Sequence, residues 1–257
     1  MKKLLSLGLL FSIVVSSVYA EKFSLRKYEN VKHFYSEIAD SAIAVAKKHN
    51  LPAAAMLALA GLESGYGSGY VAQISGNIMS LGAFKSDAEL PALYLPYSKS
   101  QKKILFDPSQ IKECSKSDLS WKKRAPSLKR DYRPAPYAGT DKNLALLKDN
   151  EKLQMKAYGE CLDDFATRWI VTTSNIPVFS SAKKWLDKKV AKDGVQTLFS
   201  ETTNVAFINK IGGVPHSFNY RKTWPPKVQY ILDRAGLVEL VNNMKKGISF
   251  EKAWSQK

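Results

Sequence analysis

The sequence predicts a mainly α-helical α+β protein, and three observations carry that prediction. Apolar residues recur at helical spacing in the early part of the chain and again after residue 160. Proline-rich, mixed sequence separates the two helical regions over about residues 84–158. The composition, 45% hydrophobic and 24% charged, is that of a chain that buries a core. We therefore expect helices on either side of a small strand-bearing insertion lobe.

The first helical region holds two predicted helices. Apolar residues at helical spacing over residues 31–49 indicate an amphipathic helix. Asn50-Leu51-Pro52 breaks that helix and starts another, because proline suits the first helical turn. The second helix should end at about Ser64, where Gly65 offers the left-handed conformation that ends many helices.

The insertion lobe, about residues 84–158, contains six prolines and little helical periodicity. Two mixed runs in it, LPALYLPYS and KLQMKAY, are candidates for strands. Residues 121–133, WKKRAPSLKRDYR, set six basic residues against Asp131. This basic stretch is either a solvated loop or a contact site for an anionic polymer.

The second helical region covers the remainder of the chain. It contains ECLDDFATRWIV at 160–171, SAKKWLDKKVAK at 181–192, then TNVAFINKI and PPKVQYILDRAGLVELVNNM. Each run keeps apolar residues at helical spacing, so we expect a cluster of helices after the insertion lobe.

The first twenty residues resemble a secretory signal. Two lysines precede an apolar centre, and Val18-Tyr19-Ala20 offers a small-residue cleavage site. The apolar part is short for a membrane span, and no other segment resembles one. We expect a signal peptide at 1–20, no stable membrane span after its removal, and one catalytic domain at 21–257 in the periplasm or otherwise outside the cytoplasm.

The chain is strongly basic. Its net charge is +16 at pH 7, and removal of Lys2 and Lys3 with the signal leaves +14. Such a charge favours polyanions, which for an exported protein are cell-wall and other anionic envelope polymers. Export makes nucleic acid the less suitable partner, and we expect none to be bound.

The two cysteines, Cys114 and Cys161, have no metal-ligand spacing, so no metal site is expected, nor any other cofactor. In an oxidising compartment a disulfide between them is expected, with two buried, unpaired thiols as the alternative. A bridge closing so long a loop could contribute several kcal/mol in the chain-entropy model.

Glu63 is the residue whose position most needs explanation. It lies four residues after Leu59 and seven after Met56, on the apolar face of the second predicted helix. Burial and the negative end of the helix dipole both disfavour the ionised carboxylate and raise its pKa. A carboxyl group that keeps its proton near neutral pH can act as a general acid. The alternative is a solvent-exposed helix end.

The stretch MLALAGLESGYGSGYVAQISGNIMSLGAF resembles the signature of bacterial glucosaminidase-domain peptidoglycan hydrolases, which include the flagellar wall hydrolase and Bax-like proteins. Residues 62–67 match its Leu-Glu-Ser/Thr-Gly-Trp/Tyr-Gly part closely. Asn77, Ile78 and Met79 match its second part loosely, and Ser80 replaces the usual glycine. The resemblance extends more weakly over most of residues 31–235.

The resemblance implies a lysozyme-like fold and cleavage of the peptidoglycan glycan strand after N-acetylglucosamine. Glu63 would protonate the glycosidic oxygen, and Tyr66 and Asn77 would line the cleft. The family also uses a tyrosine before a late helix, but that spacing is not kept here. We choose Tyr220 for a hydroxyl directed at the charged transition state, and Trp224 as a sugar-stacking platform.

A second carboxylate is harder to assign. Most glycosidases use two. Asp87, Glu89 and Glu113 fall in the insertion lobe, where the family tends to place a second acid. A lone catalytic glutamate is the alternative, with the acetamido group of the substrate as the nucleophile.

Two other functions compete with the hydrolase. A lytic transglycosylase shares the fold and the helix-end glutamate, but NIMSLGA lacks the glutamine usual in that family. A wall-binding scaffold with an inactive site is supported by Ser80 and by the displaced tyrosine. The sugar at the new reducing end separates these possibilities.

Overall fold

The computed structural model describes residues 23–84, 86–90, 93–105, 108–124, 127–133, 150–172 and 176–256. The expected signal peptide lies outside these residues. The chain divides into two compact units. Unit 1 is Met1–Ala58 with Ser174–Lys257, and unit 2 is Leu59–Thr173. The sequence predicted one domain with an insertion over 84–158, whereas unit 2 begins inside the second helix.

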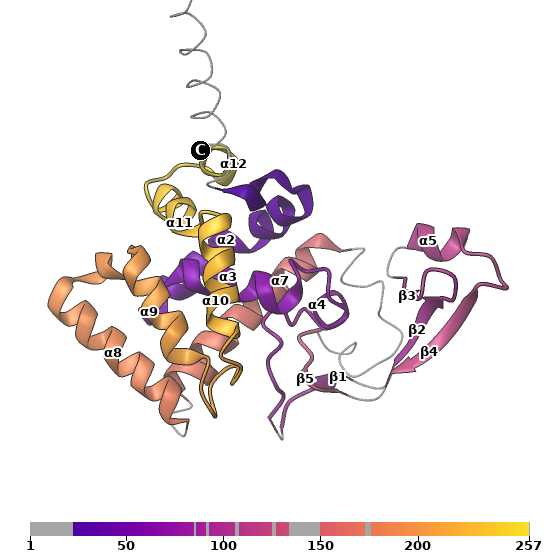
Figure 1. The fold of residues 1–257 in the computed structure, drawn as a ribbon, viewed down its shortest axis with the longest axis horizontal. Helices are drawn as coiled ribbons and strands as arrows, with labels where there is room; N and C mark the ends of the chain where they lie inside the picture. Colours follow the sequence, from indigo (N-terminus) through magenta and orange to yellow (C-terminus); the bar gives the residue numbers. More distant parts are fainter. Residues whose placement is uncertain are drawn as a thin grey trace, which may run out of the picture. The chain divides into compact units, whose positions relative to one another are not determined.

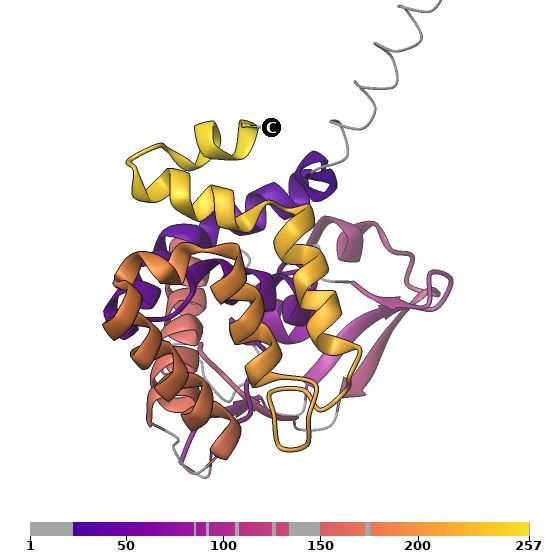
Figure 2. The same cartoon turned by 60° about the vertical axis from the view of Figure 1, so that its left-hand side comes forward.

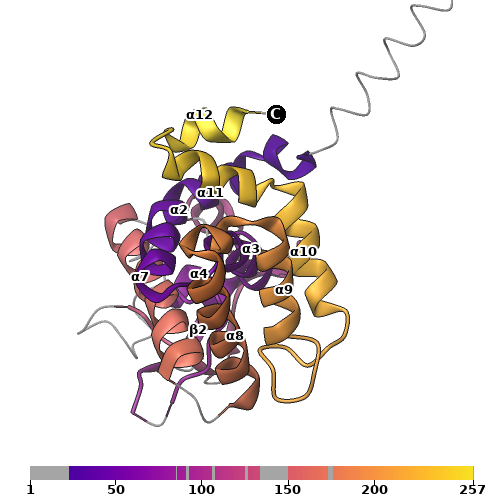
Figure 3. The same ribbon diagram turned by 90° about the vertical axis from the view of Figure 1, so that its left-hand side faces the viewer.

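Unit 1 is built from helices. After the 3-10 turn η1 (Ser24–Lys27) come α2 (Glu29–His49) and the start of α3 (Ala53–Ser64). The later part holds α8 (Pro177–Asp193), the 3-10 turn η3 (Val195–Phe199), α9 (Glu201–Ile211), α10 (Trp224–Arg234), α11 (Leu237–Lys245) and α12 (Phe250–Ser255). Helices α8 and α9 pack against each other (Figure 3). The predicted helical cluster is confirmed.

Helix α2 confirms the first periodic pattern. Phe34, Ile38 and Ala42 are spaced by four residues and are buried in the core. The helix ends at His49, and Asn50 closes it in the left-handed conformation with φ 52°. Asparagine tolerates this conformation better than most residues, so the break expected here has a local cause.

Arg26 joins the start of unit 1 to its C-terminal helices, drawn in yellow in Figure 2. Its guanidinium donates to the carbonyl oxygens of Ala235, Gly236, Ala253 and Trp254 at 2.8–3.1 Å. Burial lowers the pKa of Arg26 to about 10, against the opposing charge of Glu239. The segment around Arg26 is therefore anchored in the fold of unit 1.

Unit 2 combines helices with two small antiparallel sheets. Its helices are the end of α3, α4 (Tyr70–Ser75), α5 (Pro108–Glu113) and α7 (Glu151–Asp164), which continues as the π-helix η2 (Phe165–Thr172). Strand β1 (Glu89–Leu90) pairs with β5 (Ser127–Arg130). The second sheet has the order β3-β2-β4, from β2 (Leu93–Ser98), β3 (Lys103–Ile104) and β4 (Leu119–Arg124).

We call β2, β3, α5 and β4 the strand lobe (Figure 1). Leu95 of β2 is fully buried and belongs to one apolar cluster with Ile74 of α4 and Leu90 of β1. The α+β, mainly helical class is thus confirmed, and LPALYLPYS contains a strand as predicted. KLQMKAY does not: it lies in α7, where the Asn150 side chain accepts from the Leu153 N–H at 3.0 Å and starts the helix.

Candidate active site

Glu63 lies in the last turn of α3, in unit 2, and its side chain is half-buried. The helix ends in a Schellman motif, because the Tyr66 N–H donates to the Gly61 carbonyl at 3.0 Å. Gly65, Tyr66 and Gly67 all have positive φ, at 57°, 54° and 75°. The backbone therefore turns away directly after the glutamate, as the glycines in the sequence suggested.

Ser64 fixes this turn from inside. Its hydroxyl donates to the Ala60 carbonyl at 2.6 Å and accepts from the Gly67 N–H at 2.8 Å. Ser64 itself is buried. Tyr66, expected to line the cleft, is half-buried and holds a left-handed φ that only the surrounding turn makes tolerable. The position of Glu63 thus rests on a rigid support.

Lys129 of β5 is the charged group that the structure brings to Glu63. Its ammonium donates to the Ser80 carbonyl at 2.5 Å. Burial lowers the pKa of Lys129, while the charges of Glu63 and Tyr70 act in the opposite direction. A half-buried cation and the glutamate therefore interact electrostatically, although they lie 66 residues apart in the sequence. By sequence, Lys129 belongs to the basic stretch at 121–133, predicted to be either a solvated loop or a contact site for an anionic polymer.

Asn77 does not line a cleft, which corrects the sequence prediction. It is 1% exposed, and its amide group is engaged with the backbone. Nδ2 donates to the carbonyls of Leu81 and Arg130 at 2.9 and 3.0 Å, and Oδ1 accepts from the Leu81 N–H at 2.8 Å. Asn77 therefore holds the turn that presents the Ser80 carbonyl to Lys129.

Ser80 occupies the position where the resembling family usually has glycine. Its φ of 55° lies in the left-handed region that glycine adopts most readily. Serine keeps the glycine-type backbone here, and its carbonyl accepts from Lys129. Position 80 therefore has a backbone conformation that glycine would adopt more readily than serine.

Asp87 is held in an ion-pair network and is not a movable second acid. Its carboxylate lies 2.7 Å from Arg130 Nη1 and 2.9 Å from Arg168 Nη1, and it accepts from the Phe84 N–H at 2.8 Å. Arg168 also lies 3.5 Å from Asp164. Burial opposes ionisation, but the hydrogen bonds and both arginine charges overcome it and lower the pKa of Asp87.

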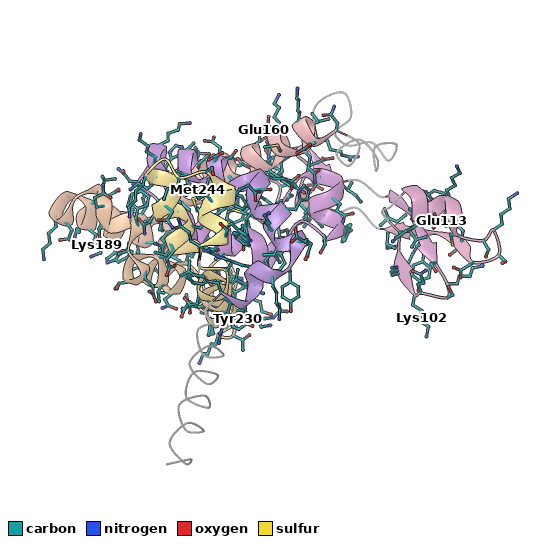
Figure 4. All side chains as sticks on the ribbon, turned by 90° about the horizontal axis from the view of Figure 1, so that it is seen from above. Lys102, Glu113, Glu160, Lys189, Tyr230 and Met244 are labelled. Carbon is teal, nitrogen blue, oxygen red and sulfur yellow. The ribbon has the colours of Figure 1, made fainter. Side chains whose placement is uncertain are left out.

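The other two candidates for a second acid are exposed. Glu89 is in β1, opposite Arg130 in the register of the sheet. Glu113 ends α5 in the strand lobe, and Figure 4 labels it there together with Lys102. The structure thus removes Asp87 from the three candidates and leaves Glu89 and Glu113 undistinguished.

Trp224 and Tyr220, both in unit 1, differ in accessibility. Trp224 is 3% exposed, packs against Phe218 at 5.4 Å between ring centroids, and fills the space beside Gly212. It is a core residue, so the prediction of a sugar-stacking platform is wrong. Tyr220 is 66% exposed, as a ligand-contacting side chain must be. Its assignment to the site remains a prediction.

The expected disulfide is not formed, since Cys114 and Cys161 are both free thiols. Cys114 follows α5, and its thiol donates to Asp118 at 3.3 Å. Cys161 is fully buried in α7, with its sulfur 3.6 Å from Asn77 Oδ1. Each thiol is thus part of its own local hydrogen-bonded cluster. Burial raises the pKa of Cys161 to about 12.

Nothing in the described part of the chain forms a metal centre: no group of three or more His, Cys, Asp or Glu side chains is arranged to hold an ion. Over the same residues, no helix has the length and apolar character needed to cross a membrane. Comparisons with protein-family models, curated proteins and solved structures give no match for this chain.

Proposed function

We propose that this chain is an exported peptidoglycan hydrolase with a lysozyme-like fold. It cleaves the glycan strand after N-acetylglucosamine, as an endo-β-N-acetylglucosaminidase. The observation that carries the proposal is the half-buried Glu63 at the rigidly terminated end of an apolar helix, in electrostatic interaction with the half-buried Lys129. The motif resemblance at residues 62–67 supports the same assignment.

In this mechanism Glu63 donates its proton to the glycosidic oxygen as the bond breaks. The best general acid has a pKa near the working pH. Partial burial and the helix C-terminus raise the pKa of a carboxyl group at this position, whereas a neighbouring cation acts in the opposite direction. Lys129 supplies that cation and stabilises the carboxylate left after proton transfer. The role of Tyr220, a hydroxyl directed at the charged transition state, stays a prediction from the sequence.

The engagement of Asp87 by two arginines supports a mechanism with a single protein acid. The acetamido group of the substrate then serves as nucleophile, as in known substrate-assisted glycosidases. If a second protein carboxylate takes part, Glu89 and Glu113 are the remaining candidates, and both are accessible.

Export is part of the proposal and rests on the signal-like residues 1–20. A lytic transglycosylase is distinguished from the proposed hydrolase by its product, which ends in a 1,6-anhydro ring. The scaffold alternative predicts binding of purified sacculi without release of sugar fragments.

The test is Glu63→Gln, with Glu160→Gln on the exposed surface of α7 as the matched control. The amide keeps the shape of the side chain but cannot deliver the proton. Release of fragments from purified peptidoglycan should fall by on the order of 10²–10⁴. Mass spectrometry should show N-acetylglucosamine at the new reducing ends. Turnover by Glu63→Gln within about threefold of the control would remove Glu63 from the mechanism.

A further inference from the structure

One face of the strand lobe carries two large aromatic side chains in the solvent. Strands β2 and β4 pair antiparallel, with Tyr94 opposite Lys123 and Pro96 opposite Trp121. Directly opposed residues and residues two apart along a strand share a face, so these four side chains lie together. Tyr94 is 51% exposed and Trp121 is 59% exposed.

This face is the one turned away from the core of unit 2. Leu95, between Tyr94 and Pro96, points to the other side and is fully buried with Ile74 and Leu90. On this side of the sheet the two rings are exposed and Pro96 between them is buried, whereas Leu95 is buried on the other side. Polar residues normally cover the solvent side of an antiparallel sheet, whereas here this face presents two rings. We call it the aromatic face.

The surroundings of the aromatic face are basic. Lys123 Nζ, on this face, lies 5.8 Å from the centre of the Tyr94 ring. Lys122, the next residue of β4, belongs to the opposite face, where its Nζ lies 5.0 Å from the centre of the Tyr97 ring. Among the described side chains of residues 94–123 there are seven lysines, all exposed, against two acids. One of these acids, Asp118, accepts local hydrogen bonds, including those from the Ser98 hydroxyl and the Ser100 N–H.

We propose that the aromatic face binds an anionic glycan strand at a position separate from the bond that is cut. Pyranose rings present apolar C–H groups that pack on the electron-rich faces of Trp121 and Tyr94. Carboxylates along the strand are attracted by Lys123 and the neighbouring lysines. The choice of a glycan rests on the proposed function, since peptidoglycan is the carbohydrate polymer that Glu63 would cleave.

The same geometry shows which residues of the basic stretch WKKRAPSLKRDYR are accessible to a polymer. Its β4 part, with Trp121, Lys122 and Lys123, is exposed. In its β5 part Leu128 is exposed, but the two cations are engaged within the fold, because Lys129 donates to the Ser80 carbonyl and Arg130 pairs with Asp87. Among the described side chains of the stretch, those of Trp121, Lys122 and Lys123 are exposed, so these are the residues of the stretch that we assign to polymer binding.

The test measures binding of the mature chain to purified peptidoglycan sacculi in a Glu63→Gln background, so that the ligand is not consumed. The double variant Tyr94→Ala, Trp121→Ala should bind at least about tenfold more weakly. Tyr230→Ala, which removes an aromatic residue 55% exposed in α10, is the matched control and should bind normally. The single variant Trp121→Ala should also bind more weakly, whereas Trp121→Phe keeps an aromatic ring and should retain most of the binding.

A second pair of variants tests the charge. Lys122→Gln with Lys123→Gln should weaken binding at low salt, and much less at high salt, because exposed charges are screened over about 8 Å at physiological ionic strength. Lys188→Gln with Lys192→Gln, on the exposed side of α8, removes the same charge elsewhere and should have little effect. Equal effects of both pairs would assign the attraction to net charge and overturn the proposal.

The outcomes separate this proposal from the proposed function. Turnover of a short neutral chitooligosaccharide by chains with intact Glu63 should survive the aromatic substitutions, because such a ligand need not reach the aromatic face. If sacculus binding is unchanged within twofold in the double variant, the aromatic face is not a glycan site, whatever the turnover. If the double variant loses binding to anionic phospholipid vesicles or single-stranded DNA but not to sacculi, the partner is wrong. If the double variant loses sacculus binding but the parent chain shows no turnover, only the proposed hydrolase activity is refuted.

Discussion

Replacement of Asn77 by alanine separates a structural role from the cleft role that the sequence suggested. The substitution removes three hydrogen bonds of 2.8–3.0 Å to the backbone of Leu81 and Arg130. Each such bond contributes about 0.5–1.5 kcal/mol net. The Leu81 carbonyl still accepts from the Arg130 N–H at 3.1 Å, so its loss is partial. We expect the free energy of unfolding of unit 2 to fall by about 3 kcal/mol.

Asn77→Ala should lower the overall stability of the protein and also loosen the backbone near Leu81. Urea denaturation gives the change in unfolding free energy, and amide hydrogen exchange at Leu81 reports the bond that Asn77 Oδ1 accepts. Asn209→Ala is the control, because that exposed side chain accepts a single bond, from Gln229, and should cost less than about 0.5 kcal/mol. If Asn77→Ala leaves stability and Leu81 exchange unchanged but abolishes sugar release, the structural reasoning is refuted.

Three further predictions concern unit 2. Native, unreduced protein should react with a thiol reagent at Cys114 but not at the buried Cys161, and denaturation without reductant should make both thiols reactive. If fewer than two thiols react in the denatured, unreduced protein, the prediction of a disulfide between them would be correct after all. Lys129→Met removes a cation that interacts with Glu63, so the pKa of the proposed general acid should rise and the alkaline limb of the pH–activity profile should move to higher pH. If this limb does not move, Lys129 has no role in setting the pKa of the acid. Gly76→Ala should destabilise by about 1–3 kcal/mol, since its Cβ would meet that of Ala157 at 2.5 Å and its φ is 71°. Adding Ala157→Gly should recover only part of this loss, and full recovery would show that the positive φ costs nothing.

The sequence by itself determined the helices on either side of the insertion and the position of Glu63. Helix periodicity and the residues that end helices act within a few positions of one another, so Asn50 and Gly65 marked real boundaries. The same local logic placed β2 correctly. The local pattern of KLQMKAY was ambiguous, because a short mixed run fits either a strand or a helix. The Asn150 cap starts a helix here.

Only the tertiary structure decided which side chains are available for chemistry. Asn77 and Trp224 were expected in a cleft, yet both are buried, because their neighbours in space lie far along the chain or around a tight turn. Asp87 was an open candidate until two distant arginines neutralised it. Lys129 seemed part of a basic surface and instead is half-buried, donates to the Ser80 carbonyl and interacts electrostatically with Glu63. Burial and charge pairing are set by contacts between distant segments, and no pattern within one segment encodes them.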